Sequence, residues 1–574
     1  MKITKTDVFL VIICVIMIVF QVWMDLAVPA YMSDITTLIQ TPNSDVSEIT
    51  NVGLMMLLCS FLSLVASVVT IFCSAKLSAV IGKQLHTMIF NKVIDFNNEE
   101  IDKFSIASLL SRTIRDVDGV KHILVIGLQV CTKAPIMFVW ALLKIIDKAW
   151  QWSTITACSV AIILLASAVA IIIVTPRFKI IEELVDKASR ITRESLNGIR
   201  VIRAYNAEQH QEKTFNNVND ELLKHYLFSN KIMAFLTPFL SFVLSGIGLA
   251  VYWTGAFIIS AAPAAEKLTI FSDMVVYSTY AMHVISAFLL IGGTLLALPS
   301  VWVHVKRLKE VMDEKIKITT GTIALTDSIE TIEFKNVSFM YPEAKEKVLN
   351  DISFTINKGE TVAIIGATGS GKTSLINLLL RLYDVSYGEV LINNINIKDF
   401  QLEDLRSKLG YVSQKAILFS GNIAKNITYG KDADLTKINN SLEIAQAFDF
   451  VSELKDKEQA NVAQNGSNYS GGQKQRLSIA RALYKNPEVL IFDDSFSALD
   501  YKTDSKLRNE LDKQMAETTK IIIAQRIGTI KKADKILVLD RGNLISIGTH
   551  DKLLRECSIY KEIALSQLTE EELL

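Results

Sequence analysis

A glycine-rich segment in the second half of the sequence carries the strongest chemical signal. It follows the apolar run Thr361 to Ile365 and precedes Ser374 to Leu382, which is predicted to form a helix. Glycines let backbone N–H groups surround a phosphate at the positive end of a helix, a lysine neutralises the β and γ oxygens, and a hydroxyl ligates Mg²⁺. The motif assigns to a nucleotide the residues Gly366, Ala367, Thr368, Gly369, Ser370, Gly371, Lys372, Thr373 and Ser374, with Thr373 also a Mg²⁺ ligand. The alternative is a glycine turn that holds no ligand.

Two adjacent carboxylates suit the same chemistry. Asp493 follows the apolar run Val489 to Phe492, and from a strand end its carboxylate can hold the Mg²⁺ shell. Asp494 stands where a base could polarise the attacking water. The segment Ser470 to Gly472 precedes a basic amphipathic helix predicted at Lys474 to Leu483. A serine and two glycines at a helix start predict a second phosphate cradle.

From about Thr331 onward, short apolar runs alternate with helical segments. IEFKNVSF alternates with a period of two, and TVAII, VLIF, IIIA and KILVLD are continuous apolar runs typical of buried strands. Strands interleaved with helices predict an α/β domain of the phosphate-loop type over residues 331–574. The charged segment 306–330 is predicted to link it to the preceding domain.

The first half of the 574-residue sequence is dominated by apolar runs. Runs long enough to cross roughly 30 Å of hydrocarbon lie near Val8–Met32, Gly53–Ser74, Ile123–Leu143, Ile155–Val174, Phe235–Ile259 and Ile270–Val303. We therefore predict an all-α membrane domain of six transmembrane helices over residues 1–305. A signal peptide at Val8–Val28 is the alternative for the first run, although no small-residue cleavage site follows it. The 60 Lys and Arg residues balance 60 Asp and Glu, which argues against a nucleic-acid partner.

Loop charges predict the orientation. The long segments Ala75–Lys121 and Pro176–Lys231 are rich in Lys and Arg, whereas Ser33–Asn51 contains acids and no basic residue. Basic residues near span ends stay in the cytoplasm. Both long segments, both termini and the second domain are therefore expected on the cytoplasmic side of a multi-pass protein of the cell membrane. Amphipathic spacing predicts that the helices continue into the cytoplasm, with turns near Glu99–Ala107 and Asn206–Phe215 that reach another domain; solvated hairpins are the alternative.

Six spans, a phosphate loop and an SGGQ helix start together resemble the ATP-binding cassette (ABC) exporter family in its half-transporter layout, over essentially the whole chain. SLLSRTIRDVDGV and ESLNGIRVIRAYNAEQHQEKTF are similar to the family's intracellular loops. The resemblance implies that ATP and Mg²⁺ bind, and that two ATP-binding domains sandwich two ATP molecules, each between one chain's phosphate loop and the other chain's signature. It assigns roles to Tyr341 (stacking on adenine), Gln414 (sensing Mg²⁺ and contacting the membrane domain), Ser470, Gly471, Gly472 and Gln473 (the signature that caps the opposite ATP) and Asp500 (the D-loop, Ser497–Asp500).

Two positions near the expected γ-phosphate depart from the family pattern. Asp494 replaces the usual glutamate, and the missing methylene withdraws its carboxylate by roughly 1 Å from the water it must touch. Gln525 replaces the switch histidine, so it can hydrogen-bond a phosphate but cannot carry positive charge. We expect ATP in this chain's own phosphate loop to bind well and turn over slowly, with Asp494, Gln525 and Gln414 as the residues that set the rate.

The nearly intact signature predicts a heterodimer, because a second half-transporter subunit with a complete set of hydrolytic residues would form one competent site against it. The chain thus resembles the degenerate-site subunit of a bacterial multidrug exporter. A slow homodimer is the alternative.

The cargo is expected to be a small amphiphilic drug or a lipid taken from the surrounding membrane lipids. A dedicated lipid or peptide exporter and a nucleotide-gated channel are the alternatives. Charged residues at membrane depth are disfavoured, so the sequence marks Asp25, Lys133, Asp273 and His283 as candidates for the pathway, with a structural role favoured over cargo contact.

Overall fold

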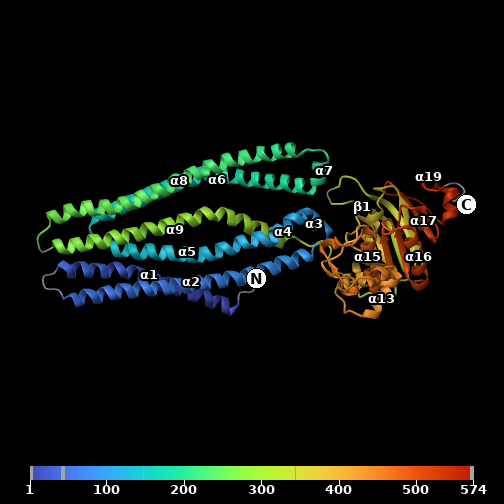
Figure 1. Ribbon diagram of the computed structural model, residues 1–574, viewed down its shortest axis with the longest axis horizontal. Coiled ribbons are helices and arrows are strands. Elements are labelled where there is room, and N and C mark those ends of the chain that lie inside the picture. The colour runs from blue at the N-terminus through green and yellow to red at the C-terminus, as the bar shows by residue number, and fades with distance from the viewer. Residues whose placement is uncertain (1–3, 41–44, 147, 265, 343, 569–574) are drawn as a thin grey trace. The chain divides into compact units, whose positions relative to one another are not determined.

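The computed structural model describes residues 4–40, 45–146, 148–264, 266–342 and 344–568. The chain divides into two compact units, Met1–Ile94 with Ile106–Glu314, and Asp95–Ser105 with Lys315–Leu574. The first unit is helical, and the second contains the strands (Figure 1).

Long helices make up the first unit. They are α1 (Lys5–Gln40), α2 (Val46–Ile94), α5 (Val117–Ile145), α6 (Trp150–Asn197), α8 (Glu208–Ala261) and α9 (Lys267–Asp313), with the short α4 (Ile106–Ser111), a π-helical turn (Arg112–Asp116) and α7 (Ile199–Ala204) between them. Among the described residues, six helices are long and apolar enough to span a membrane, which confirms the predicted six. The 54 residues of α8 extend roughly 80 Å, well beyond the roughly 30 Å of a bilayer core. The helices therefore continue past the apolar stretches.

The long helices pack in pairs, α1 with α2, α5 with α9 and α6 with α8 (Figure 1). Trp152 and Tyr277 are buried where α6 meets α9, their ring centroids 5.4 Å apart. Gly255 of α8 lies at the same place, where a Cβ would come within 2.3 Å of Met274 Sδ. A small residue thus allows close approach of the helices.

The charged residues at membrane depth form ion pairs within this unit. Lys133 Nζ lies 3.2 Å from Asp25 Oδ2, and Ser63 donates to the other carboxylate oxygen of Asp25. Lys148 Nζ lies 2.7 Å from Asp273 Oδ1. These pairs join α1 to α5, and the turn before α6 to α9. The contacts favour the structural role predicted for Asp25, Lys133 and Asp273.

The second unit is built on a six-stranded sheet in the order β12-β11-β3-β10-β9-β6. Its strands are β3 (Thr361–Gly366), β6 (Leu409–Val412), β9 (Val489–Asp493), β10 (Thr519–Ile523), β11 (Lys535–Asp540) and β12 (Asn543–Gly548). Neighbours from β11 to β6 are parallel, and only β12 is antiparallel. The apolar runs of the sequence are the central strands, because both faces of a parallel sheet are covered. This confirms the predicted α/β class.

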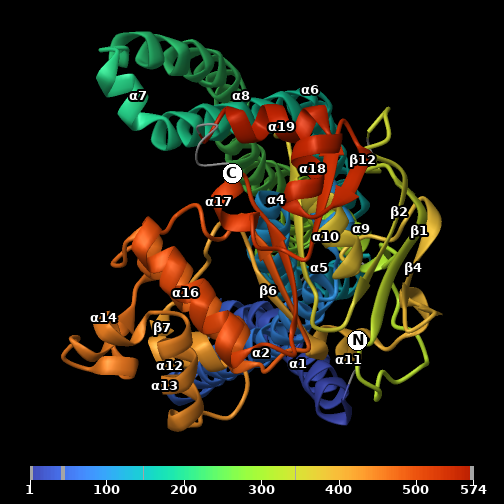
Figure 2. The same cartoon turned by 90° about the vertical axis from the view of Figure 1, so that its right-hand side faces the viewer.

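A four-stranded antiparallel sheet, in the order β2-β1-β4-β5, completes the strand layers. It contains β1 (Thr331–Phe339), β2 (Leu349–Asn357), β4 (Tyr387–Ile392) and β5 (Ile395–Asn396), while β7 (Gly421–Asn422) pairs with β8 (Asn461–Val462). Figure 2 shows β1, β2 and β4 side by side, with α12, α13 and α14 gathered away from them. The helices are α3 (Asn98–Phe104), α10 (Lys372–Leu379), α11 (Leu402–Lys408), α12 (Ile423–Thr428), α13 (Leu435–Ile444), α14 (Phe448–Ser452), α15 (Gly471–Tyr484), α16 (Tyr501–Gln514), α17 (Ile527–Ile530), α18 (His550–Glu556) and α19 (Ser558–Leu565).

Two predicted helix boundaries are wrong. The helix after the phosphate loop was expected from Ser374 to Leu382, but α10 runs from Lys372 to Leu379. Gly371, with a φ of 97°, is its left-handed N-cap, so the helix begins at the lysine itself. The second helix was expected to begin at Lys474, but α15 begins at Gly471, because the Ser470 side chain caps it.

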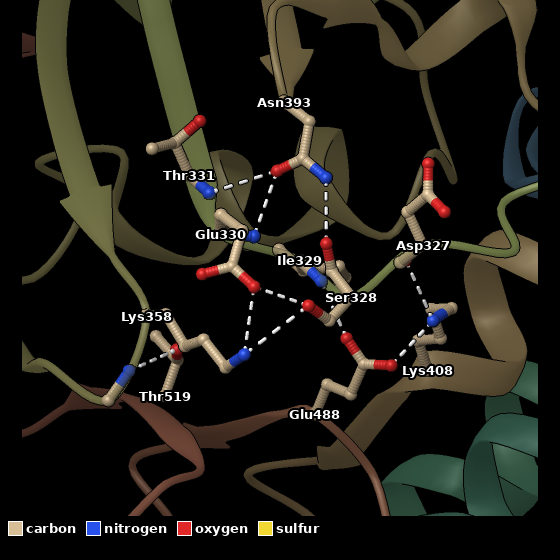
Figure 3. A network of polar contacts seen from close by, with 11 residues as sticks. Asp327, Ser328, Ile329, Glu330, Thr331, Lys358, Asn393, Lys408, Glu488 and Thr519 are labelled. Atoms are coloured by element: carbon tan, nitrogen blue, oxygen red, sulfur yellow. Dashed lines mark hydrogen bonds and ion pairs between the residues drawn. The ribbon is translucent and has the colours of Figure 1, made fainter.

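The chain enters β1 through a network of polar contacts (Figure 3). Asn393 Oδ1 accepts hydrogen bonds from the backbone N–H groups of Glu330 (2.8 Å) and Thr331 (3.1 Å), and Asn393 Nδ2 donates to Ser328 O at 2.7 Å. Glu488 accepts from the backbone N–H of Ile329 at 2.6 Å. These bonds fix the backbone that leads from the predicted linker 306–330 into the sheet. α9 takes in residues 306–313 of that linker.

Candidate functional site

The phosphate loop joins β3 to α10, and its glycines are required by the backbone. Gly369 and Gly371 have φ values of 85° and 97°, a region that residues with a side chain rarely adopt. A Cβ at Gly371 would come within 2.6 Å of the Leu349 side chain, and one at Gly366 within 2.1 Å of Leu539 O. The loop is therefore held against its neighbours while Ala367, Thr368 and Gly369 remain exposed. Exposed backbone at a helix start is the geometry that a phosphate group needs.

The ammonium group of Lys372 is held by the loop itself. Its Nζ donates to Gly366 O and Ala367 O, each at 2.8 Å, and lies 3.5 Å from Ser370 Oγ. Burial lowers the pKa of Lys372, while the negative charges of Asp494 and Asp493 oppose that shift. A cation in the loop attracts phosphate oxygens, as the sequence predicts.

Oxygen atoms suited to Mg²⁺ come together beside the loop. Thr373 Oγ1 donates to Asp493 Oδ1 at 3.2 Å, and Tyr411 OH donates to Asp493 Oδ2 at 3.5 Å. Burial raises the pKa of Asp493 and the nearby charge of Asp494 adds to this rise, while bonds from Thr373 and Tyr411 oppose it. Hydroxyl and carboxylate oxygens are ligands that Mg²⁺ prefers, so Thr373 and Asp493 fit the ion.

The three residues expected to set the hydrolytic rate meet at one carboxylate oxygen. Gln525 Nε2 donates to Asp494 Oδ2 at 2.9 Å, and Gln414 Nε2 donates to the same oxygen at 3.2 Å. Asp494 is buried and has a φ of 46°. Asp tolerates this left-handed conformation better than most residues with a side chain. The structure thus brings Asp494, Gln414 and Gln525 together, and the oxygen facing both amides accepts two hydrogen bonds.

The aromatic ring expected to stack on adenine lies beside the loop. Tyr341 OH shares a hydrogen bond with Ser374 Oγ at 3.0 Å, and the ring meets Tyr383 edge to face at 5.2 Å. Tyr383 OH in turn donates to Asp102 Oδ2 at 3.2 Å, and burial raises the pKa of Tyr383. Asp102 lies on α3, in the turn predicted at Glu99–Ala107. Sequence analysis missed this contact, because the two residues are 281 positions apart.

The same turn is anchored by its acids within the second unit. Glu100 accepts hydrogen bonds from the backbone N–H groups of Asn97 (2.9 Å) and Lys317 (3.1 Å), and it is 2% exposed. Glu99 forms an ion pair with Lys317. The segment Asp95–Ser105 therefore belongs structurally to the unit that contains the phosphate loop.

The signature forms a helix start in which the side chains of Ser470 and Gln473 cap each other. Gln473 N donates to Ser470 Oγ at 3.3 Å, and Ser470 N donates to Gln473 Oε1 at 2.9 Å. Gly471 is open, and a Cβ at Gly472 would approach Ala498 O at 3.3 Å, which places the signature against the D-loop. Asp500 caps α16 through Thr503 N at 2.9 Å. Among the described residues, no hydrogen bond joins the signature to the phosphate loop.

Gln567, near the end of the described chain, holds the loop that contains Gln525. Its Nε2 donates to Gln525 O at 2.7 Å, and its Oε1 accepts from Ile527 N at 2.9 Å. This contact could not be predicted from the sequence, because a side-chain amide that binds backbone groups leaves no motif. Gln567 thus positions the backbone on both sides of Arg526.

Comparison with protein families agrees with this geometry. Residues 11–288 match the ABC transporter transmembrane region, and residues 349–497 match the ABC transporter family of ATP-binding domains. The fold is similar to that of a bacterial Atm1-family ABC exporter solved with ATP bound, with a TM-score of 0.84 and 23% identity over 97% of this chain and 99% of that one.

Curated relatives cover most of the chain. An uncharacterised ABC transporter ATP-binding protein of Mycobacterium tuberculosis is 32% identical over 91% of this chain and 90% of its own length. YfiB of Bacillus subtilis is 32% identical over 90% of each chain, and an ATP-dependent lipid A-core flippase of Pseudomonas syringae is 30% identical over 86% of this chain and 82% of its own. The chain therefore belongs to the ABC transporter family, as an ATP-hydrolysing exporter half-transporter in which a membrane domain is fused to an ABC ATPase domain.

Proposed function

We propose that this chain is the degenerate-site subunit of a heterodimeric exporter, and that ATP in its own phosphate loop is hydrolysed slowly. The observation that carries the proposal is the occupied carboxylate oxygen of Asp494, which accepts hydrogen bonds from Gln525 at 2.9 Å and Gln414 at 3.2 Å. A general base must accept a proton from water within hydrogen-bond distance. A short carboxylate already bonded to two amides is poorly placed to do so.

Contact with the γ-phosphate is also weakened, because Gln525 stands in place of the family's switch histidine. The amide of Gln525 is neutral, so it can donate a hydrogen bond to a phosphate but supplies no positive charge. Lys372, Thr373 and Asp493 remain for binding, and Mg²⁺ held by Thr373, Asp493 and Gln414 would neutralise phosphate charge. Binding is therefore retained while a positioned base is lost, which costs about 100- to 10,000-fold in rate.

The nearly intact signature supports a second, different subunit. Ser470, Gly471 and Gly472 keep the helix start that cradles phosphate. In the heterodimer these residues cap ATP held by the companion subunit, which supplies its own base. ATP binding closes the two ATP-binding domains, and Gln414 and the turns at Glu99–Ala107 and Asn206–Phe215 pass this closure to the membrane domain, residues 1–305.

The proposed cargo is an amphiphilic drug or a lipid, moved outward across the cell membrane. The excess of Lys and Arg in Ala75–Lys121 and Pro176–Lys231 supports a cytoplasmic location for the ATP-binding domain, residues 331–574, and for both termini. The lipid A-core flippases among the relatives favour the lipid branch of this class.

The test is to purify the full chain alone and together with the product of an adjacent half-transporter gene, and to measure ATP hydrolysis. Turnover that appears only in the mixture is expected. The variant carrying Asp494→Glu and Gln525→His should raise turnover of the complex, since it restores the longer carboxylate and a chargeable ring. Rapid hydrolysis by the isolated wild-type chain would contradict the proposal.

A further inference from the structure

An apolar groove runs between α6 and α8, two helices of the first unit that lie side by side (Figure 1). Its cavity has a volume of about 650 Å³, within the range of small-molecule sites. From α6 it is lined by Ile162 to Ile173, and from α8 by Phe228 to Phe239. The only charged residue among its described lining residues is Lys231.

The groove has the length of one bilayer leaflet. Eleven helical steps separate Ile162 from Ile173, which corresponds to roughly 16 Å at 1.5 Å per residue. Half of a hydrocarbon core is roughly 15 Å. The walls remain open, because Leu165 is 67% exposed and Phe235 is 72% exposed. An extended hydrocarbon chain therefore matches the groove in both polarity and length.

Basic groups stand at one end of the groove. Lys231 precedes the apolar stretch of α8 by one turn, and Arg177 follows that of α6. The Arg177 guanidinium lies 4.9 Å from the ring centroid of Phe228, which lines the groove, and its Nη1 lies 3.5 Å from His225 Nδ1. Neither contact neutralises its charge with a carboxylate.

We propose that this groove binds an anionic phospholipid of the bilayer, with an acyl chain along Leu165, Val169 and Phe235 and the phosphate at Lys231 and Arg177. Two features indicate an anionic phospholipid: an apolar wall as long as one leaflet, and cations at one end of it. A zwitterionic or neutral lipid would bind less tightly, because those cations would attract its headgroup less. Each cation near an anionic headgroup favours binding by about fivefold.

The test compares lipid retention by the delipidated full chain in detergent. The protein is incubated with equal amounts of phosphatidylglycerol and phosphatidylcholine of identical acyl chains, and bound lipids are counted by native mass spectrometry. The wild-type chain is expected to prefer phosphatidylglycerol by about five- to 25-fold. Arg177→Gln with Lys231→Gln should bring that preference to about one. Lys213→Gln, an equal charge change on an exposed residue of α8, should leave it unchanged.

A second pair of measurements examines the apolar wall and the occupant. Val169→Trp, which fills the groove, should lower retention of both lipids, while an unchanged elution profile and midpoint of thermal unfolding in size-exclusion chromatography after heating report that the membrane unit is folded. The photoreactive analogue p-benzoylphenylalanine at position 235 should form adducts with lipid. Equal retention of both lipids, an unchanged preference after Arg177 and Lys231 are replaced, or cross-links to a second subunit in place of lipid would overturn the proposal. Lipid counts do not depend on ATP turnover, so this result stands apart from that of the heterodimer test.

Discussion

At the scale of single residues, the described contacts place the oxygens of Thr373 and Asp493 side by side and bring two amides to one oxygen of Asp494. The motif positions of Thr373 and Asp493 predicted a shared ion site, and the two side chains lie 3.2 Å apart. The location of the Asp494 carboxylate beside this site was also predictable, because Asp494 directly follows the buried strand that ends at Asp493. The hydrogen bonds from Gln414 and Gln525 to one oxygen of Asp494 were not predictable. They depend on where two loops come together in the folded domain.

Gln567→Ala is expected to weaken discrimination between ATP and ADP by the isolated chain. The change removes the bonds to Gln525 O and Ile527 N and so loosens the loop whose amide can reach the γ-phosphate. A loss of about 1 kcal/mol corresponds to roughly a fivefold fall in the ratio of ATP to ADP affinity. Fluorescent-nucleotide competition would measure it.

The matched control is Gln514→Ala, since Gln514 is exposed and its side chain donates a hydrogen bond to Glu510 of the same helix. Affinity for ADP should stay the same in both variants. An equal fall for ADP and ATP would show that Gln567 contributes to general stability and does not position the switch loop.

At the scale of elements, periodicity and length predicted most of the architecture. Continuous apolar runs predicted β3, β9, β10 and β11, and the membrane helices followed from runs too long for a soluble core. The helix starts were misplaced by two or three residues, because a left-handed Gly371 and the capping serine Ser470 act one residue before the helix. The docking of Asp95–Ser105 in the second unit depends on Glu100 and Asp102, whose partners lie hundreds of residues away.

Asn393→Ala is expected to destabilise the entry into β1. It removes two acceptor bonds to Glu330 N and Thr331 N and the donor bond to Ser328 O. Each bond is worth about 1 kcal/mol, so the midpoint of thermal unfolding, followed by loss of ATP-analogue binding, should fall by several degrees. Asn393→Asp keeps the acceptor oxygen and should lose less. Equal losses in the two variants would argue against the two backbone bonds as the cause.

Lys133→Met is expected to destabilise the membrane domain more than the double change Asp25→Asn with Lys133→Met. The single change leaves the Asp25 carboxylate without the ammonium that now lies 3.2 Å away, at a cost of roughly 1–3 kcal/mol. The double change removes both charges, and Ser63 can still bond to the amide that replaces the carboxylate. Heating followed by size-exclusion chromatography would rank the variants. A double variant less stable than Lys133→Met alone would contradict the pairing.

At the scale of the whole molecule, the chain combines two departures from the family pattern, Asp494 and Gln525, with a signature helix that is capped at Ser470. Fold class, membrane spans and ATP binding could be read from one sequence, because each leaves a local pattern. The companion subunit leaves no such pattern in this chain. We infer it from an imbalance between two sets of residues: Asp494 and Gln525 depart from the family pattern, whereas Ser470, Gly471 and Gly472 keep it.

That imbalance predicts effects of very different size for two substitutions in the purified complex. Ser470→Arg places a bulky cation at the helix start that caps the companion's ATP, so it should lower ATP hydrolysis by roughly 100-fold or more. If the site is degenerate as proposed, Asp494→Asn removes a carboxylate that contributes little to hydrolysis and should lower turnover far less than Ser470→Arg. Steady-state phosphate release would measure both. A loss of turnover with Asp494→Asn as severe as that with Ser470→Arg would contradict the proposal, because it would show that Asp494 itself acts as the base.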